Sequence, residues 1–181
     1  MRKRFHDRPG FTLIEMLIVV IVLGILAMII VPQITVSTED AKVNTLKTNL
    51  SAMRNAIEIY YHQHNETYPG MKKTDGTGAD VTNVAAAATA FVDQLTKYTE
   101  GSGKAAGDST TLTNPVGPYI KGGKLPENPF DLDNDVKCDI TTTDITTRVA
   151  DSTTSLLFYC KTGVLIANDG GSSGGTAHAD Y

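Results

Sequence analysis

Apolar residues dominate the chain from position 11 onward, and this run predicts the first element. From Phe11 to Val31 only Thr12 and Glu15 are strongly polar. As an α-helix these 21 residues rise about 31 Å, which matches the hydrocarbon core of a bilayer. The run is also longer than the apolar region of an ordinary signal peptide. The pattern therefore predicts a membrane-spanning helix that carries one acid, Glu15, near its start.

A second pattern follows, in which apolar residues recur every three or four positions. Its members are Leu46, Leu50, Met53, Ile57, Tyr60 and Tyr61. Charged residues lie largely off this stripe, as on a helix that packs one face against a protein core. Pro69 and Gly70 end the pattern. Pro32 lies between the two parts, where it either kinks one long helix of about residues 11–64 or ends the membrane span.

The rest of the chain predicts a small head with mixed secondary structure. Apolar steps of four and three residues predict a helix over 83–98, with Thr82 or Asn83 as its cap. The polar stretches 71–82 and 100–114 are rich in turn residues and predict loops.

The C-terminal part predicts strands. Threonine and β-branched residues are frequent in 140–149, and strands 156–160 and 164–167 flank a three-residue turn typical of a hairpin. The tail from Asn168 is rich in Gly and Ser, so we expect it to be irregular. The predicted fold class is α+β: a long N-terminal helix whose second half packs against a small antiparallel β-sheet.

Charge is distributed unevenly along the chain. The net charge is −4, yet the first ten residues hold four basic side chains and one acidic one. Because basic flanks stay on the cytoplasmic side of a membrane, we expect the acidic body outside the cytoplasm. Nothing in this charge pattern suggests a nucleic-acid partner. In an oxidising compartment Cys138 and Cys160 would form a disulfide, and two buried free thiols are the alternative.

An acidic stretch near the predicted sheet is the one candidate metal site. Asp131, Asp133, Asp135 and Asp139 occupy the first, third, fifth and ninth positions of an EF-hand loop. The glycine at position six and the glutamate at position twelve are missing, so this is not an EF-hand. Calcium could still bind Asp131, Asp133 and Asp135, although a solvated acidic turn is the simpler interpretation. We find no set of nucleophile, base and acid in the sequence, so we expect no enzyme.

Residues 1–34 resemble the N-terminus of type IV prepilins and of the pseudopilins of type II secretion. The resemblance lies in a short basic leader, then Gly10, Phe11 and Glu15, and about twenty apolar residues with Pro32 near their end. A weaker resemblance covers the body. There, Gly117-Pro118-Tyr119-Ile120 and Leu125-Pro126-Glu127-Asn128-Pro129-Phe130 look like the region before the sheet in major pseudopilins.

The resemblance implies how the N-terminal segment is processed and used. A prepilin peptidase would cut between Gly10 and Phe11 and methylate the new amine of Phe11. Glu15 could then pair with the Phe11 amine of a neighbouring copy during assembly. Pro32 matches the family position for a kink or a locally melted helix.

The resemblance also implies the organisation and the partners of the chain. It divides the chain into a cleaved leader (1–10), a transmembrane and assembly half-helix (11–34), an amphipathic half-helix (35–66) and an α+β head (67–181). The chain would cross the inner membrane once, with its head outside the cytoplasm. It would then polymerise with copies of itself into a periplasmic or cell-surface filament, through an assembly ATPase and a platform protein in the inner membrane.

Three functions remain open at this point. The first is a major pseudopilin of type II secretion, and the second is a major or minor pilin of a type IV pilus. The third, from another class, is an exported or membrane-anchored soluble binding protein in which residues 1–34 are an ordinary signal peptide or anchor.

Overall fold

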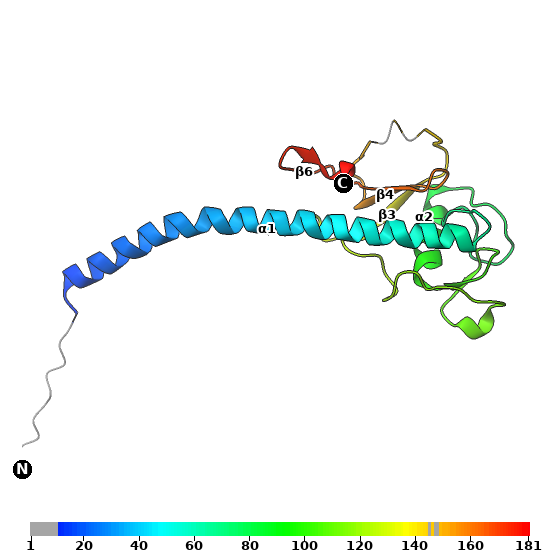
Figure 1. Ribbon diagram of the computed structural model, residues 1–181, viewed down its shortest axis with the longest axis horizontal. Coiled ribbons are helices and arrows are strands. Elements are labelled where there is room, and N and C mark those ends of the chain that lie inside the picture. The colour runs from blue at the N-terminus through cyan, green and yellow to red at the C-terminus, as the bar shows by residue number, and fades with distance from the viewer. Residues whose placement is uncertain (1–10, 145, 147–148) are drawn as a thin grey trace, which may run out of the picture. The chain divides into compact units, whose positions relative to one another are not determined.

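The computed structural model describes residues 11–144, 146 and 149–181, and only the backbone of residues 29–37. The chain divides into two compact units, Met1–Ala41 and Lys42–Tyr181, which are described separately below. Helix α1, Leu13–Gln63, contributes to both units (Figure 1). Its bounds agree with the predicted helix of about 11–64. Pro32 therefore lies inside a helix, and whether it kinks that helix or ends the membrane span stays a prediction.

In the first unit, the large apolar side chains of α1 that the structure describes are exposed to solvent. The large apolar side chains from Phe11 to Met28 that the structure describes are between 45% and 86% exposed. Within the described part of the chain, no helix has the length and apolar character needed to cross a membrane.

In the second unit, α1 buries the stripe that the sequence predicts. Leu46, Leu50, Met53, Ile57 and Tyr60 are each at most 1% exposed, while Tyr61 is half-buried. Helix α2, Val84–Thr96, begins where the sequence indicates. Its cap is Asn83, whose side-chain oxygen accepts a hydrogen bond of 2.8 Å from the amide of Ala86.

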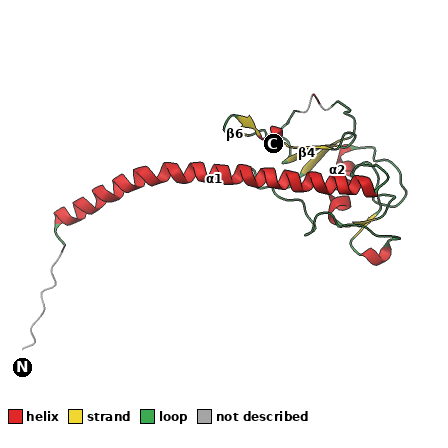
Figure 2. Cartoon of the chain, in the orientation of Figure 1, coloured by secondary structure: helices red, strands yellow, loops and turns green. Residues whose placement is uncertain are grey.

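The main sheet has three strands in the order β3-β4-β5. They are β3 (Val136–Asp139), β4 (Leu156–Tyr159) and β5 (Val164–Ala167). Figure 2 draws strands in yellow and labels β4. Strands β4 and β5 form the predicted antiparallel hairpin. Strand β3 pairs with β4 in parallel, so the expectation of a wholly antiparallel sheet is wrong. The connection 140–155 supplies the crossover that parallel neighbours require.

The strand expected in 140–149 is absent from the described residues of that range. Its first residues turn instead, because the carboxylate of Asp139 accepts hydrogen bonds from the amides and hydroxyls of Thr141 and Thr142. Such local side-chain acceptors compete with a strand ladder for the backbone. The β-branched composition of 140–149 was thus a misleading signal.

One apolar core joins these elements. It contains buried residues of α1, α2 and all three strands of the main sheet. At its centre the rings of Phe91, from α2, and Phe158, from β4, lie 4.5 Å apart. The coarse prediction of an α+β fold with a long N-terminal helix is therefore confirmed.

Most of the remaining short elements occupy segments that were expected to be irregular, but one of them includes Tyr98, where the predicted helix 83–98 was expected to end. These short elements are β1 (Tyr98–Thr99), β2 (Ala105–Ala106), η1 (Ser109–Thr111), β6 (Ser172–Ser173), β7 (Thr176–Ala177) and η3 (His178–Asp180). β1 pairs antiparallel with β2, and β6 pairs antiparallel with β7. The Gly- and Ser-rich tail is consequently more ordered than its composition indicates.

Candidate functional site

The start of α1 is closed by a reciprocal pair of side chains, Thr12 and Glu15. The amide and the hydroxyl of Thr12 donate to Glu15 Oε2 at 2.7 Å and 2.8 Å. In return, the amide of Glu15 donates to the Thr12 hydroxyl oxygen at 3.3 Å. This is a capping box, which satisfies amides that the first turn of a helix otherwise leaves without partners. Glu15 thus has a partner within its own chain.

Sequence reasoning missed this partner of Glu15. The signal was present, because a threonine followed three residues later by a glutamate, just before an apolar run, is the pattern of a capping box. Phe11, one residue before the cap, is 81% exposed. Gly10 and the side chain of Pro32 lie outside the described residues, so the cleavage site and the role of Pro32 stay predictions.

The fold brings the two cysteines together. Cys138 lies on β3 and Cys160 directly follows β4, and both are fully buried. Both are free thiols in the structure. A hydrogen bond with Cys160 that favours the protonated Cys138 thiol, together with burial, raises the pKa of Cys138 above its ordinary value. The two side chains are thus neighbours, and a disulfide between them stays a prediction.

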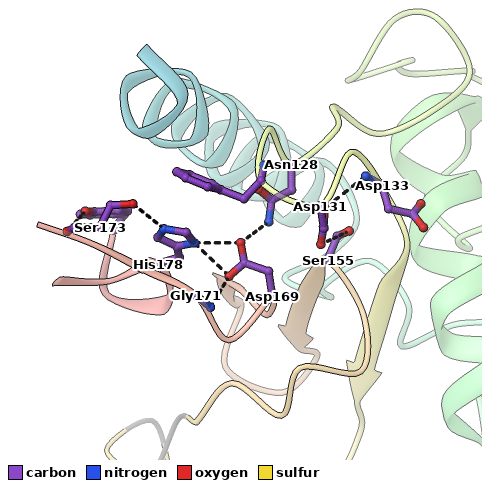
Figure 3. Close-up of polar contacts among 10 residues, drawn as sticks. Asn128, Asp131, Asp133, Ser155, Asp169, Gly171, Ser173 and His178 are labelled. Atoms are coloured by element: carbon purple, nitrogen blue, oxygen red, sulfur yellow. Dashed lines mark hydrogen bonds and ion pairs between the residues drawn. The ribbon is translucent and has the colours of Figure 1, made fainter. Parts of the chain in front are cut away.

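The predicted calcium ligands line an acidic hollow of about 260 Å³. Figure 3 shows two of them, Asp131 and Asp133, near Ser155. Asp131, Asp133 and Asp135 line the hollow together with Asp169, from the C-terminal tail. Several of their oxygens already accept hydrogen bonds. Asp131 Oδ2 bonds the Ser155 hydroxyl at 2.8 Å, and Asp135 Oδ1 bonds the Ser155 amide at 2.6 Å. Across the part of the chain that the structure describes, no three His, Cys, Asp or Glu side chains are placed to hold a metal ion, so calcium binding stays a prediction.

Asp169 also belongs to a buried polar network beside this hollow (Figure 3). Its carboxylate accepts a hydrogen bond of 2.8 Å from Asn128 Nδ2 and faces His178 Nδ1 at 2.8 Å. The amide of Gly171 adds a third bond of 3.0 Å. Burial alone would raise the pKa of Asp169, but these bonds outweigh it and the pKa falls below its usual value. The network joins the C-terminal tail to the loop that contains Asn128.

His178 extends the network to a serine. Its Nε2 lies 3.0 Å from the hydroxyl oxygen of Ser173, so serine, histidine and aspartate form a hydrogen-bonded chain. Two overlapping G-x-S-x-G matches, centred on Ser172 and Ser173, were a signal that sequence reasoning overlooked. The arrangement resembles that of a nucleophile, its base and an orienting acid.

The surroundings of the hydrogen-bonded residues Ser173, His178 and Asp169 favour a structural role. His178 is 2% exposed and its ring lies 3.9 Å from the ring of Phe130. The acidic hollow is lined by Asp169 and not by Ser173 or His178. Ser173 also lies on a two-residue strand rather than at the strand-to-helix turn on which a nucleophile of this motif sits. We therefore interpret the network as a set of structural contacts that hold the C-terminal tail against the loop that contains Asn128.

Residues 6–31 match the family model of the prokaryotic N-terminal methylation motif. The chain is 41% identical over 68 residues to type II secretion system core protein G of Pseudomonas aeruginosa, which covers 38% of this chain and 47% of that protein. With core protein G of Vibrio cholerae it shares 37% identity over 67 residues, which covers 37% of this chain and 45% of that protein.

A relative with another name also matches. Competence protein ComGC of Halalkalibacterium halodurans is 31% identical over 64 residues, which covers 35% of this chain and 63% of that protein. No solved structure matches the chain. The chain spans about half the length of the core protein G relatives that it matches. It therefore carries a prepilin-type methylation motif and is similar to type II secretion pseudopilins.

Proposed function

We propose that this chain is a structural subunit of a type IV pilus-like filament, and specifically a major pseudopilin of type II secretion. The observation that carries the proposal is the N-terminal segment: a methylation motif over 6–31 that coincides with exposed apolar side chains and the acid Glu15. Apolar surface of this extent needs a bilayer or other protein copies around it. Relatives named core protein G favour the secretion filament.

Processing creates the group that Glu15 needs for assembly. Cleavage between Gly10 and Phe11 by a prepilin peptidase leaves a positive amine on Phe11, which the peptidase then methylates. Gly10 suits the cut because it has no side chain to clash in a narrow protease cleft. The amine exists only on processed chains, so only these can form the ion pair.

The capping box leaves Glu15 able to take part in that pair. The hydrogen bonds with Thr12 occupy Oε2. The second carboxylate oxygen, Oε1, can accept the Phe11 amine of a neighbouring copy. A lone carboxylate is costly within a membrane, so a matched charge lowers the cost of burying it. Because a buried pair specifies register more than it adds stability, misaligned copies are selected against.

Location and partners follow from this proposal. Before assembly the chain spans the inner membrane once through residues 11–34, with the head outside the cytoplasm. An assembly ATPase and a platform protein in the inner membrane then drive polymerisation into a periplasmic filament. The oxidising compartment around the head favours a disulfide between Cys138 and Cys160, whose side chains are neighbours.

A type IV pilus pilin is the second candidate, and the similarity to a competence protein favours it. The two candidates differ in what is lost when the gene is deleted. Deletion abolishes secretion of exported enzymes if the chain is a pseudopilin, while surface fibres remain. The opposite result, intact secretion with lost fibres or lost DNA uptake, assigns the chain to a pilus.

Co-expression with a prepilin peptidase tests processing. We expect wild type and Gly10→Ala to shorten by the leader, because both residues are small. Gly10→Val should stay full length and should not assemble. Normal processing of Gly10→Val, or a cut beyond residue 34, would instead favour an exported soluble protein with an ordinary signal peptide.

A further inference from the structure

A second buried histidine, His64, lies at the end of α1 and takes no part in the proposed assembly. It directly follows the helix and is 2% exposed. Its ring stacks on that of Tyr60, with centroids 3.7 Å apart, and is nearly perpendicular to the ring of Tyr119, with centroids 6.1 Å apart. The turn after it requires left-handed backbone at Asn65 and Glu66, with φ of 53° and 57°. The imidazole is therefore enclosed where helix, turn and head meet.

Hydrogen bonding fixes which ring nitrogen of His64 carries the proton. Nδ1 lies 2.9 Å from the carbonyl oxygen of Tyr60, which can only accept, so Nδ1 donates. In the neutral ring Nε2 is then a bare acceptor. It is buried and has no hydrogen-bond partner. The Thr99 hydroxyl, on β1, is the other buried polar side-chain atom of the described chain without a partner.

The groups that face His64 offer no negative charge to an imidazolium. They are the phenols of Tyr60 and Tyr119 and the backbone of Glu100. The carboxylate of Glu100 instead accepts hydrogen bonds from Ser102 and from the amide of Thr113. Among the described residues no carboxylate forms an ion pair with His64. A proton added to Nε2 would thus place a buried positive charge where no carboxylate pairs with it.

We propose that His64 is a proton-sensing residue, whose protonation loosens the turn 64–70 and the segment 98–104 from the end of α1. Opening this contact lets water reach the charged ring. The proposal does not depend on filament assembly. If the head lies outside the cytoplasm, as proposed above, His64 is exposed to changes in the pH of the cell's surroundings.

The direction of the effect follows from the pKa of His64. Burial lowers it below the ordinary 6.5, and the backbones of Tyr60 and Glu100, which favour the protonated ring, offset only part of this shift. Below 6.5 the open state therefore binds a proton that the closed state does not. The free energy that holds the contact closed is therefore largest above pH 6.5 and decreases as pH falls through this value. It stops decreasing once His64 is protonated in the closed state too.

Native-state hydrogen exchange on the full chain in detergent micelles tests the proposal. Amides of 98–104 are compared with those of β4 and β5 between pH 5 and 8, after correction for intrinsic exchange. We expect the opening constant of 98–104 to rise by up to about tenfold per pH unit below 6.5, while the strands change little. His64→Gln should flatten this dependence. His62→Gln, at an exposed histidine of the same helix end, should leave it as in wild type.

Two results would overturn the proposal. One is an equal pH dependence in wild type and His64→Gln. The other is a uniform rise across 98–104, β4 and β5, which would indicate global unfolding. If His64→Gln fails to fold, the wild-type chain still decides the question by NMR titration of its imidazole protons. A midpoint for His64 below 6.5 supports the proposal, and one at or above 6.5 rejects it.

Discussion

Arg54 is the side chain whose loss most directly tests how α1 is fastened to the head. Its Nε and one terminal nitrogen donate to the carbonyl oxygen of Leu165, on β5, at 3.2 Å and 2.8 Å. The other terminal nitrogen donates to the carbonyl oxygen of Tyr181 at 2.8 Å. One guanidinium therefore ties the helix to the sheet and to the C-terminal tail. Arg54→Met keeps most of the aliphatic stem and removes all three bonds.

The expected cost can be worked from these contacts. A hydrogen bond from a charged donor contributes about 1.5–3 kcal/mol when buried. Two carbonyl groups lose such a donor, and partial exposure of Arg54 lowers the sum to about 2–4 kcal/mol of unfolding free energy. Arg54→Lys should cost about 1–2 kcal/mol, because one ammonium cannot serve both carbonyls. Lys47→Met is the control: its ammonium lies 4.2 Å from the centre of the Tyr181 ring, worth at most about 1 kcal/mol.

Equilibrium urea unfolding of the full chain in micelles measures these differences. Circular dichroism or tyrosine fluorescence follows the transition, since the chain has no tryptophan. The expected order of destabilisation is Arg54→Met, then Arg54→Lys, then Lys47→Met. If Arg54→Met costs no more than Lys47→Met, the guanidinium does not fasten α1 and the reasoning fails.

Three further predictions use other contacts. Asn83→Ala removes the cap of α2 and should cost about 1 kcal/mol in the same unfolding assay, whereas Asn83→Ser should cost much less. Thr12→Val removes the hydroxyl that holds Glu15, so we expect a lower filament yield on sedimentation, and Thr12→Ser should restore it. Partial burial raises the pKa of Asp139, but hydrogen bonds led by those of Thr142 outweigh it and lower the pKa to about 2. This group therefore stabilises the fold above its ordinary pKa of 3.8, and its contribution is lost as pH falls from 3.8 towards 2; acid titration of Asp139→Asn should lack this step.

The sequence predicted those elements that depend on contacts between residues three or four positions apart. The stripe that includes Leu50 and Ile57 gave the buried face of α1, because a helix places residues three and four apart on one side. Asn83 was identifiable as a cap for the same reason: its partner is only three residues away. Thr12 and Glu15 obey this rule too, so their capping box could have been predicted.

Contacts between distant segments could not be read in this way. The parallel pairing of β3 with β4 sets Cys138 opposite Phe158, and no spacing in the sequence fixes that register. The network around Asp169 depends on Asn128, which is 41 positions away. Such contacts are decided by tertiary packing. The acidic loop was recognisable by its composition, but the tail that closes it was not.

The intact mass of subunits from isolated filaments tests the central claim most directly. The account predicts a mass that corresponds to a chain beginning at Phe11 with one added methyl group on that residue. Subunits that begin at Met1, or beyond residue 34, would contradict it. In either case the filament would lack the Phe11 amine that pairs with Glu15 in the proposed assembly.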